Sequence, residues 1–182
     1  MCSPFFSNRS LIMRTCFLIF FCLFSTATVH AACDSNIPAS TPDSQLIDNG
    51  DGTVTDSKTG LMWKQCVEGL SGSTCATGTA DTFNWQAALQ QPGTVNGGGG
   101  FAGYTDWRLP DIAELESLVE KQCHSPAINT TRFPNTPSST VWSGSPYAHY
   151  SGIAWYVGFN NGYSNFGYRF GNYGVRLVRG GQ

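Results

Sequence analysis

Residues 49–56 read Asn-Gly-Asp-Gly-Thr-Val-Thr-Asp, and residues 59–63 read Thr-Gly-Leu-Met-Trp. The first run places Asn49-Gly50 and Asp51-Gly52 between short stretches of β-forming residues. Both dipeptides tolerate the positive φ angles that tight hairpin turns require. The sequence therefore predicts three antiparallel strands, at residues 46–48, 53–56 and 61–64, which form a small meander.

Two helices are predicted in the middle of the chain. The first covers residues 83–91, with Asp81 or Thr82 as its cap, and ends at Pro92-Gly93. A flexible glycine-rich loop follows at residues 96–100. The second helix opens at Pro110-Asp111 and runs to about Cys123, with one apolar face turned toward a sheet.

Short strands are predicted again near the end of the chain, at residues 140–143, 154–159, 163–170 and 173–179. Turns at residues 160–162 and 171–172 separate the last three, because both turns contain Asn and Gly.

Composition excludes several classes of protein. The chain has 182 residues, of which 12% are charged and 13% aromatic. Disordered chains and coiled coils have far more charge and fewer aromatic residues. With a formal net charge of −2, no nucleic-acid partner is expected.

The N-terminus is typical of a secretory signal peptide. Arg9 and Arg14 precede an uncharged, largely apolar run that closes on Ala31-Ala32. This pattern predicts a signal peptide at residues 1–32, a linker at 33–45 and one domain at 46–182. The protein is therefore expected in the periplasm, on the cell surface or secreted. Translation could start at Met1 or Met13.

Removal of the signal peptide leaves four of the seven cysteines, which suits two disulfides in an oxidising compartment. Pairing Cys66 with Cys75 is the local choice and leaves Cys33 for Cys123, although three connectivities are possible. Lipidation of Cys33 is the alternative. It would be the only contact with a membrane after export, and it would leave one thiol unpaired.

Several of these stretches together resemble the Lcl C-terminal domain family, a bacterial domain of unknown function. The resemblance covers residues 46–180 and rests on four motifs in order: the opening hairpin, Asp106-Trp107-Arg108-Leu109-Pro110, Trp142-Ser143 with Ala154-Trp155-Tyr156-Val157, and Val175-Arg176-Leu177-Val178-Arg179. It implies a C-type-lectin-like α+β fold, with two helices on small antiparallel sheets and long irregular loops, similar to the formylglycine-generating, sulfatase-modifying fold. It also implies kinship with the ligand-binding end of adhesins that recognise sulfated glycosaminoglycans.

The motif residues themselves are expected to be structural. Four tryptophans in short apolar patterns predict core positions: Trp63, Trp107, Trp142 and Trp155. Arg108 is expected to be a semi-buried strut bonded to Asp106 or to a backbone carbonyl. Arg176 is expected to play the same part in the last strand.

No pattern of catalytic or metal-binding residues is present in the sequence. The histidines of the predicted mature chain, His124 and His149, lie at no ligand spacing with one another or with a cysteine. A calcium loop starting at Asp48 would need an acid at its last position, which is Thr59. Sulfatase-modifying enzymes work through late cysteines, and none follows Cys123. No cofactor, metal or enzymatic activity is therefore expected, although a structural calcium ion stays possible and unsupported.

The remaining candidate is the segment from residue 147 to 173, whose Tyr, Asn, Ser and Gly content matches that of antibody paratopes. It predicts a module that binds a glycan or a partner protein in the manner of an adhesin. The alternatives are a periplasmic structural or assembly protein, in which the same aromatics fill the core, and an unrecognised enzyme. The candidate binding residues are Tyr147, Tyr150, Asn160, Asn161, Tyr163, Asn165, Tyr168, Arg169 and Tyr173.

Overall fold

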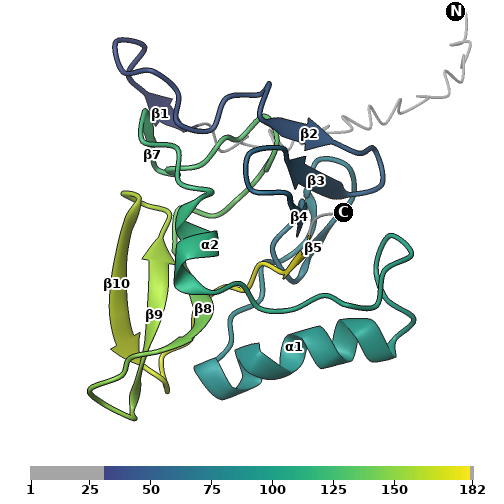
Figure 1. Cartoon of the computed structure of the whole chain (residues 1–182), viewed down its shortest axis with the longest axis vertical. Coiled ribbons are helices and arrows are strands. Elements are labelled where there is room, and N and C mark those ends of the chain that lie inside the picture. The colour runs from purple at the N-terminus through teal and green to yellow at the C-terminus, as the bar shows by residue number, and fades with distance from the viewer. Residues whose placement is uncertain (1–30, 181–182) are drawn as a thin grey trace, which may run out of the picture.

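A computed structural model describes residues 31–180 (Figure 1). Almost all of the predicted signal peptide lies outside this range. Two antiparallel sheets and two helices dominate the described chain, and the predicted α+β class is confirmed. No helix within residues 31–180 is long and apolar enough to span a bilayer.

The first sheet contains the predicted meander. Its strands β2 (Leu46–Asp48), β3 (Thr53–Asp56) and β4 (Leu61–Lys64) pair in sequence, and β11 (Val178–Arg179) adds on the far side of β4. At the tip of the first hairpin Gly50 has a φ of 77°, and its N–H donates to Asp48 Oδ1 at 2.9 Å. The Asn-Gly signal therefore placed this turn correctly.

The second sheet has the order β10-β9-β8 and stands beside α2 (Figure 1). The strands are β8 (Thr140–Pro146), β9 (Ile153–Gly158) and β10 (Tyr163–Tyr168), close to the prediction. The predicted strand at residues 173–179 is wrong in extent. After Gly174 forms a bridge to Val141, the chain leaves this sheet, and only β11 pairs regularly, with β4. The last segment therefore joins the two sheets.

Both predicted helices needed correction. Helix α1 (Trp85–Gly97) starts later and passes through Pro92, and Asn84 caps it by accepting the Ala87 N–H at 2.9 Å. Residues 96 and 97, expected in a flexible loop, close this helix. Asn96 fixes the end, because its amide donates to the Trp107 carbonyl at 2.8 Å and accepts the Trp107 N–H at 3.1 Å.

Helix α2 (Ile112–Glu116) begins as predicted but lasts only five residues. Asp111 accepts the Glu114 N–H at 2.8 Å, and Glu114 accepts the Asp111 N–H at 2.9 Å, so a capping box fixes the start. The Ser117 hydroxyl donates to the Glu114 carbonyl at 2.6 Å at the end. Val119 then pairs with Ile128, which draws the chain out of the helix.

Both expected disulfides are present, Cys33–Cys123 and Cys66–Cys75. Each lies near a two-stranded ribbon that the sequence did not predict: β1 (Ala32–Cys33) with β7 (Cys123–His124), and β5 (Leu70–Ser71) with β6 (Thr77–Gly78). The predicted linker at residues 33–45 is therefore fastened to the domain at its first residue.

Two apolar clusters form the core, one around each face of the second sheet. The first joins Leu115 and Leu118 to Trp63 and Val157. The second packs Trp85 and Trp142 against Leu177. Trp63, Trp107 and Trp142 are fully buried, whereas Trp155, expected with them, is only half-buried. That difference exposes an aromatic face of β9.

Candidate functional site

The exposed aromatic face lies on one side of β9 and β10. Phe166 stands directly opposite Trp155, and Tyr168 opposite Ile153. Because successive side chains alternate between the faces of a strand, all four point to the same side. The loop from β8 to β9 adds three rings to this side. We call the whole set the aromatic surface: Tyr147, His149, Tyr150, Trp155, Phe166, Tyr168 and Phe170.

Ring contacts join five members of the aromatic surface around Tyr147, and a separate contact joins Tyr168 to Phe170. Tyr147 is its centre, with ring centroids 4.5 Å from Phe166 and 5.4 Å from Trp155. Tyr150 stacks parallel to Tyr147 at 6.2 Å. Pairs at such distances contribute about 0.5–1.5 kcal/mol beyond burial of area. The rings therefore support one another although they face solvent.

Much of this surface is accessible. The relative exposure is 42% for Phe166, 62% for Tyr168, 64% for Tyr150 and 77% for Phe170. Tyr168 and Phe170 stack in parallel with centroids 5.2 Å apart, which leaves ring faces open to a ligand. A core role is thereby excluded for these four side chains.

The stretch of sequence that carries most of these rings has no charged side chain before Arg169. Residues 133–168 contain no Asp, Glu, Lys or Arg. Arg169, a predicted binding residue, is turned away. Its Nε donates to the Ile153 carbonyl at 3.2 Å, and its guanidinium lies 4.1 Å from the centre of the Trp85 ring. The segment itself therefore offers a ligand rings, hydroxyls and amides, and the charged side chains of Glu116 and Lys121 line a hollow beside Ser164 of β10.

The other predicted binding residues do not join this surface. Asn160, Asn161 and Tyr163 lie at the turn between β9 and β10, at the opposite end of the sheet from Tyr150. Asn161 Oδ1 accepts the Tyr163 N–H at 3.2 Å, so that amide supports the turn. Tyr163 is 72% exposed but separate from the rings of the aromatic surface.

Tyr173 and Asn165 lie toward the other face of the sheet. The Tyr173 ring packs 4.3 Å from Trp142 and 5.2 Å from Tyr156, and burial raises the pKa of its phenol. Asn165 Oδ1 accepts the Phe166 N–H at 2.8 Å. Tyr173 therefore packs against the second core cluster, and its remaining surface lines, together with Asn160, a separate hollow of about 290 Å³.

The predicted binding residues left out four members of the aromatic surface: His149, Trp155, Phe166 and Phe170. Strict alternation along the strands was the available signal. Phe166 and Tyr168 are two residues apart, so they share a face, whereas Tyr163 and Asn165 share the other one. The pairing of Trp155 with Phe166 then required the register of the two strands.

The polar residues of the central motif hold the fold. The side chain of Arg179 is only 5% exposed, and its Nε donates to Asp106 Oδ1 at 2.8 Å. This hydrogen bond lowers the pKa of the Asp106 carboxyl. Arg108 was expected to bond to Asp106 or to a backbone carbonyl, and instead its guanidinium forms two bonds of 2.6 Å to Glu114. The expected partners of Arg108 were therefore wrong, and Asp106 is bonded to Arg179.

Arg176 is the buried strut that the sequence predicted. It donates to the carbonyls of Lys64 and Gln65 and to Thr136 Oγ1, the last at 2.7 Å. Burial lowers the pKa of Arg176 to about 9, so the guanidinium stays charged at neutral pH. These three bonds join the last segment to β4 and to the loop before β8.

No cluster of three or more His, Cys, Asp or Glu side chains suited to a metal ion occurs among residues 31–180. In the proposed calcium loop, Asp48 accepts the Gly50 N–H and Asp51 accepts the Thr53 N–H and hydroxyl. Both carboxylates therefore stabilise the hairpin turn.

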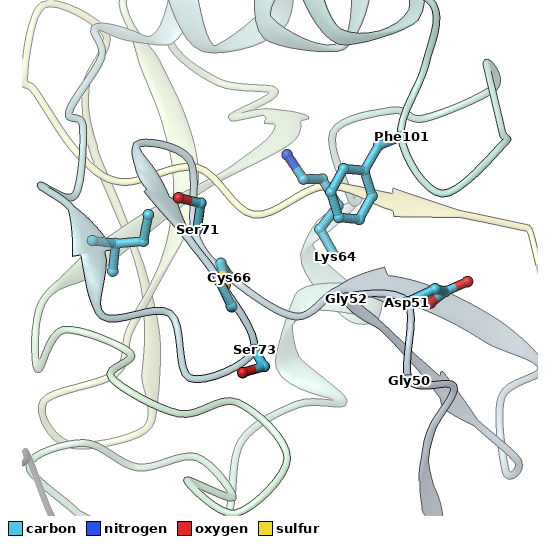
Figure 2. A pocket seen from close by; sticks show the side chains of 10 residues that line it. Gly50, Asp51, Gly52, Lys64, Cys66, Ser71, Ser73 and Phe101 are labelled. Atoms are coloured by element: carbon cyan, nitrogen blue, oxygen red, sulfur yellow. The ribbon is translucent and has the colours of Figure 1, made fainter.

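A separate cleft of about 480 Å³ opens beside this turn (Figure 2). Phe101 and Lys64 form one side, and Cys66, Ser71 and Ser73 face them across the cleft (Figure 2). The lining comes from three segments that are far apart in sequence, around residues 50–52, 64–73 and 101. No local sequence pattern could have indicated it.

Comparison with known protein families gave one match. The model of the Lcl C-terminal domain matches residues 52–179, which is 128 of the 182 residues. No curated protein matches the chain.

Proposed function

The chain belongs to the Lcl C-terminal domain family, and we propose that it is an exported, non-enzymatic binding module whose aromatic surface recognises a glycan. The family is a domain of unknown function, so the proposal depends on the surface described above. We infer the C-type-lectin-like character of the fold from the family resemblance. The two disulfides support export, because such bonds persist in oxidising compartments.

The single observation that carries the proposal is the set of open, mutually supported rings. Soluble proteins seldom leave several large aromatic side chains together in solvent without a partner. Rings with open faces stack on the apolar faces of sugar rings, and the Tyr hydroxyls can bond to sugar hydroxyls. Preorganised Tyr side chains also lose little conformational entropy on binding.

The charge distribution favours a neutral glycan. The resemblance to adhesins implies a sulfated glycosaminoglycan, but no Lys or Arg lies between residues 133 and 168. Arg169 is engaged with Trp85, and Arg176 and Arg179 are buried. Salt screens only charge-driven contacts. Binding is therefore expected to change little between low and high salt.

Two other functions compete with this one. A partner protein would also suit Tyr-rich loops, and a structural role needs no ligand. The high exposure of Tyr168 and Phe170 argues against a purely structural role, since neither ring fills the core. An enzyme has no supporting observation among the described residues.

A glycan array on the purified, exported protein, at two salt concentrations, tests the proposal. Tyr168→Ala and Phe166→Ala should each weaken binding at least tenfold. Tyr168→Ala should leave the melting temperature nearly unchanged, whereas Phe166→Ala should lower it by a few degrees, because the Phe166 ring also contacts Tyr147 and Trp155. Tyr163→Ala is the matched control, because it removes an exposed Tyr of the same strand that lies outside the aromatic surface.

Each result has a definite meaning. Binding that is lost in Tyr168→Ala and kept in Tyr163→Ala supports the assignment. Binding that survives both Tyr168→Ala and Phe166→Ala overturns the proposed site. Silence across neutral and sulfated glycans overturns glycan recognition and favours a protein ligand.

A further inference from the structure

We propose that the cleft between the first hairpin and the Cys66–Cys75 loop is a second ligand site, which takes a small molecule with a flat apolar group and an oxygen acceptor. It lies apart from the aromatic surface and shares no residue with it. Its volume of about 480 Å³ falls within the range of roughly 300–1,000 Å³ typical of small-molecule sites.

The walls of the cleft are fixed before any ligand arrives. Asp51 accepts both the N–H and the hydroxyl of Thr53, which sets the hairpin turn. The disulfide closes the Cys66–Cys75 loop on the other side. The loop at Phe101 is held by mutual backbone bonds with Tyr104, at 2.9 and 3.0 Å. A preformed site loses less entropy on binding.

The apolar part of the cleft is built around Phe101. Its ring reaches so close to Gly52 that a Cβ on that glycine would lie 2.9 Å from the ring. Leu70 and Cys66 line the opposite side. Gly50, Gly52 and Gly72 supply wall positions without side chains, so a flat group can approach the backbone closely.

Lys64 supplies the polar recognition. Its side chain is only 12% exposed, and its ammonium lies 4.7 Å from the centre of the Phe101 ring. An ammonium has three donors. Within residues 31–180 the side chain of Lys64 makes one hydrogen bond, to Glu68 at 2.7 Å. A ligand oxygen in the cleft would satisfy a further donor close to the ring.

The charges around Lys64 define the class of ligand. Glu68 offsets one positive charge, so a polyanion is not favoured. Asp51 lies on the rim, with its carboxylate directed to Thr53. The site therefore suits a molecule with at most one negative charge, such as an aryl carboxylate. Its apolar ring would contact Phe101 and Leu70.

Titration of the full exported protein with benzoate, followed in ¹⁵N–¹H NMR spectra, tests this assignment. We expect shifts confined to the amides around Gly52, Lys64, Ser71 and Phe101, with a dissociation constant on the order of 1 mM for so small a probe. Benzyl alcohol keeps the ring and a hydroxyl but lacks the charge. It should bind the same amides several-fold more weakly.

Two pairs of variants distinguish binding in the cleft from binding elsewhere on the protein surface. Lys64→Met should weaken benzoate at least fivefold and benzyl alcohol much less, whereas Lys58→Met, an exposed lysine elsewhere, should change neither. Ser73→Trp should fill the cleft and abolish the shifts, whereas Ser57→Trp should not. Because Ser73 is exposed, this variant also tests the site if Lys64→Met fails to fold.

Shifts that are absent, that scatter over the protein, or that persist in Ser73→Trp overturn the proposal. Equal loss of benzoate and benzyl alcohol in a folded Lys64→Met protein overturns the role of Lys64. None of these outcomes bears on the aromatic surface.

Discussion

Glu120 fastens the N-terminal segment to the domain, and its replacement by Gln gives a sharp test of the fold. The carboxylate is 3% exposed and accepts five hydrogen bonds. Oε1 accepts from the Ser40 N–H and hydroxyl and from the Gln122 N–H, at 2.8–3.1 Å. Oε2 accepts from the Thr41 N–H and hydroxyl, both at 2.8 Å.

The size of the effect follows from this geometry. Glu120→Gln keeps one acceptor oxygen, so its NH₂ group must face one of the two donor sets. The better choice turns the NH₂ toward Thr41, whose hydroxyl can rotate and accept a bond. The Thr41 N–H then has no acceptor there. One stranded buried donor and the lost charge assistance predict a loss of about 2–4 kcal/mol.

The difference in unfolding free energy between wild type and Glu120→Gln should depend on pH. Burial acts to raise the pKa of the Glu120 carboxyl, but the hydrogen bonds from Gln122, Ser40 and Thr41 outweigh it and hold the pKa below its ordinary value. An acid with a lowered folded pKa stabilises the protein above its unfolded pKa, and that stabilisation is lost as pH falls through the folded value. The gap between wild type and Glu120→Gln should therefore be full at pH 7 and narrow below about pH 4.5.

Urea unfolding followed by tryptophan fluorescence measures both effects. Glu116→Gln is the matched control, because it removes the same charge from an exposed position four residues before Glu120. We expect Glu116→Gln to stay within about 0.5 kcal/mol of wild type. A Glu120→Gln variant within about 0.5 kcal/mol of wild type at pH 7 would show that Glu120 does not hold residues 40 and 41 in place. A loss of unfolding free energy that stayed constant from pH 7 to pH 3.5 would contradict the lowered pKa of Glu120.

Three further outcomes are expected. Arg176→Met should lose about 2–6 kcal/mol in urea unfolding, at about 1–3 kcal/mol for each of the Lys64 and Gln65 carbonyls that it leaves without this donor; a loss below 1 kcal/mol would contradict its role. Removal of the Cys33–Cys123 disulfide as a Cys-to-Ser pair should cost up to about 4.6 kcal/mol by chain entropy across a separation of 90 residues; unchanged unfolding midpoints would exclude this bond in the native protein. Asn84→Ala should cost about 1 kcal/mol by loss of the helix cap, with Asn84→Asp as the control that keeps it.

The predictable parts of the fold are those set by neighbouring residues. Asn49-Gly50 fixes its own turn, and Asp111 with Glu114 fixes the start of α2, so sequence reasoning placed both. The short spacing of Cys66 and Cys75 made that disulfide the local choice, which left Cys33 for Cys123, 90 residues away. Apart from this remaining pair, each signal operates within about ten residues.

The features that escaped prediction depend on contacts between distant segments. Helix α1 continues past Pro92 because Asn96 is bonded to Trp107 on another segment. The segment at residues 33–45 is ordered because Glu120 accepts its N–H groups, some 80 residues away. Arg108 is bonded to Glu114, while Arg179, from a distant part of the chain, is bonded to the Asp106 carboxylate.

The candidate site shows the same division. The late segment was identified from its Tyr and Asn content, and that signal does mark a region of exposed rings. Composition could not separate Tyr168, which faces solvent, from Tyr173, which packs on Trp142. That distinction depends on strand register and on where the chain leaves the sheet after Gly174.

The motifs that identify the family are largely committed to holding the fold. Trp63, Trp107 and Trp142 are buried, Asp106 binds Arg179, and the buried Arg176 joins β4 to the last segment. Side chains with such structural roles cannot also turn toward a ligand. The open rings of Tyr168 and Phe170 and the uncommitted donors of Lys64 lie outside the motifs. Of the motif residues, the half-buried Trp155 and the hairpin residues 50–52 are the ones that reach the two proposed sites. Family membership alone thus specifies the fold, and variants such as Tyr168→Ala and Lys64→Met test the ligand sites proposed on it.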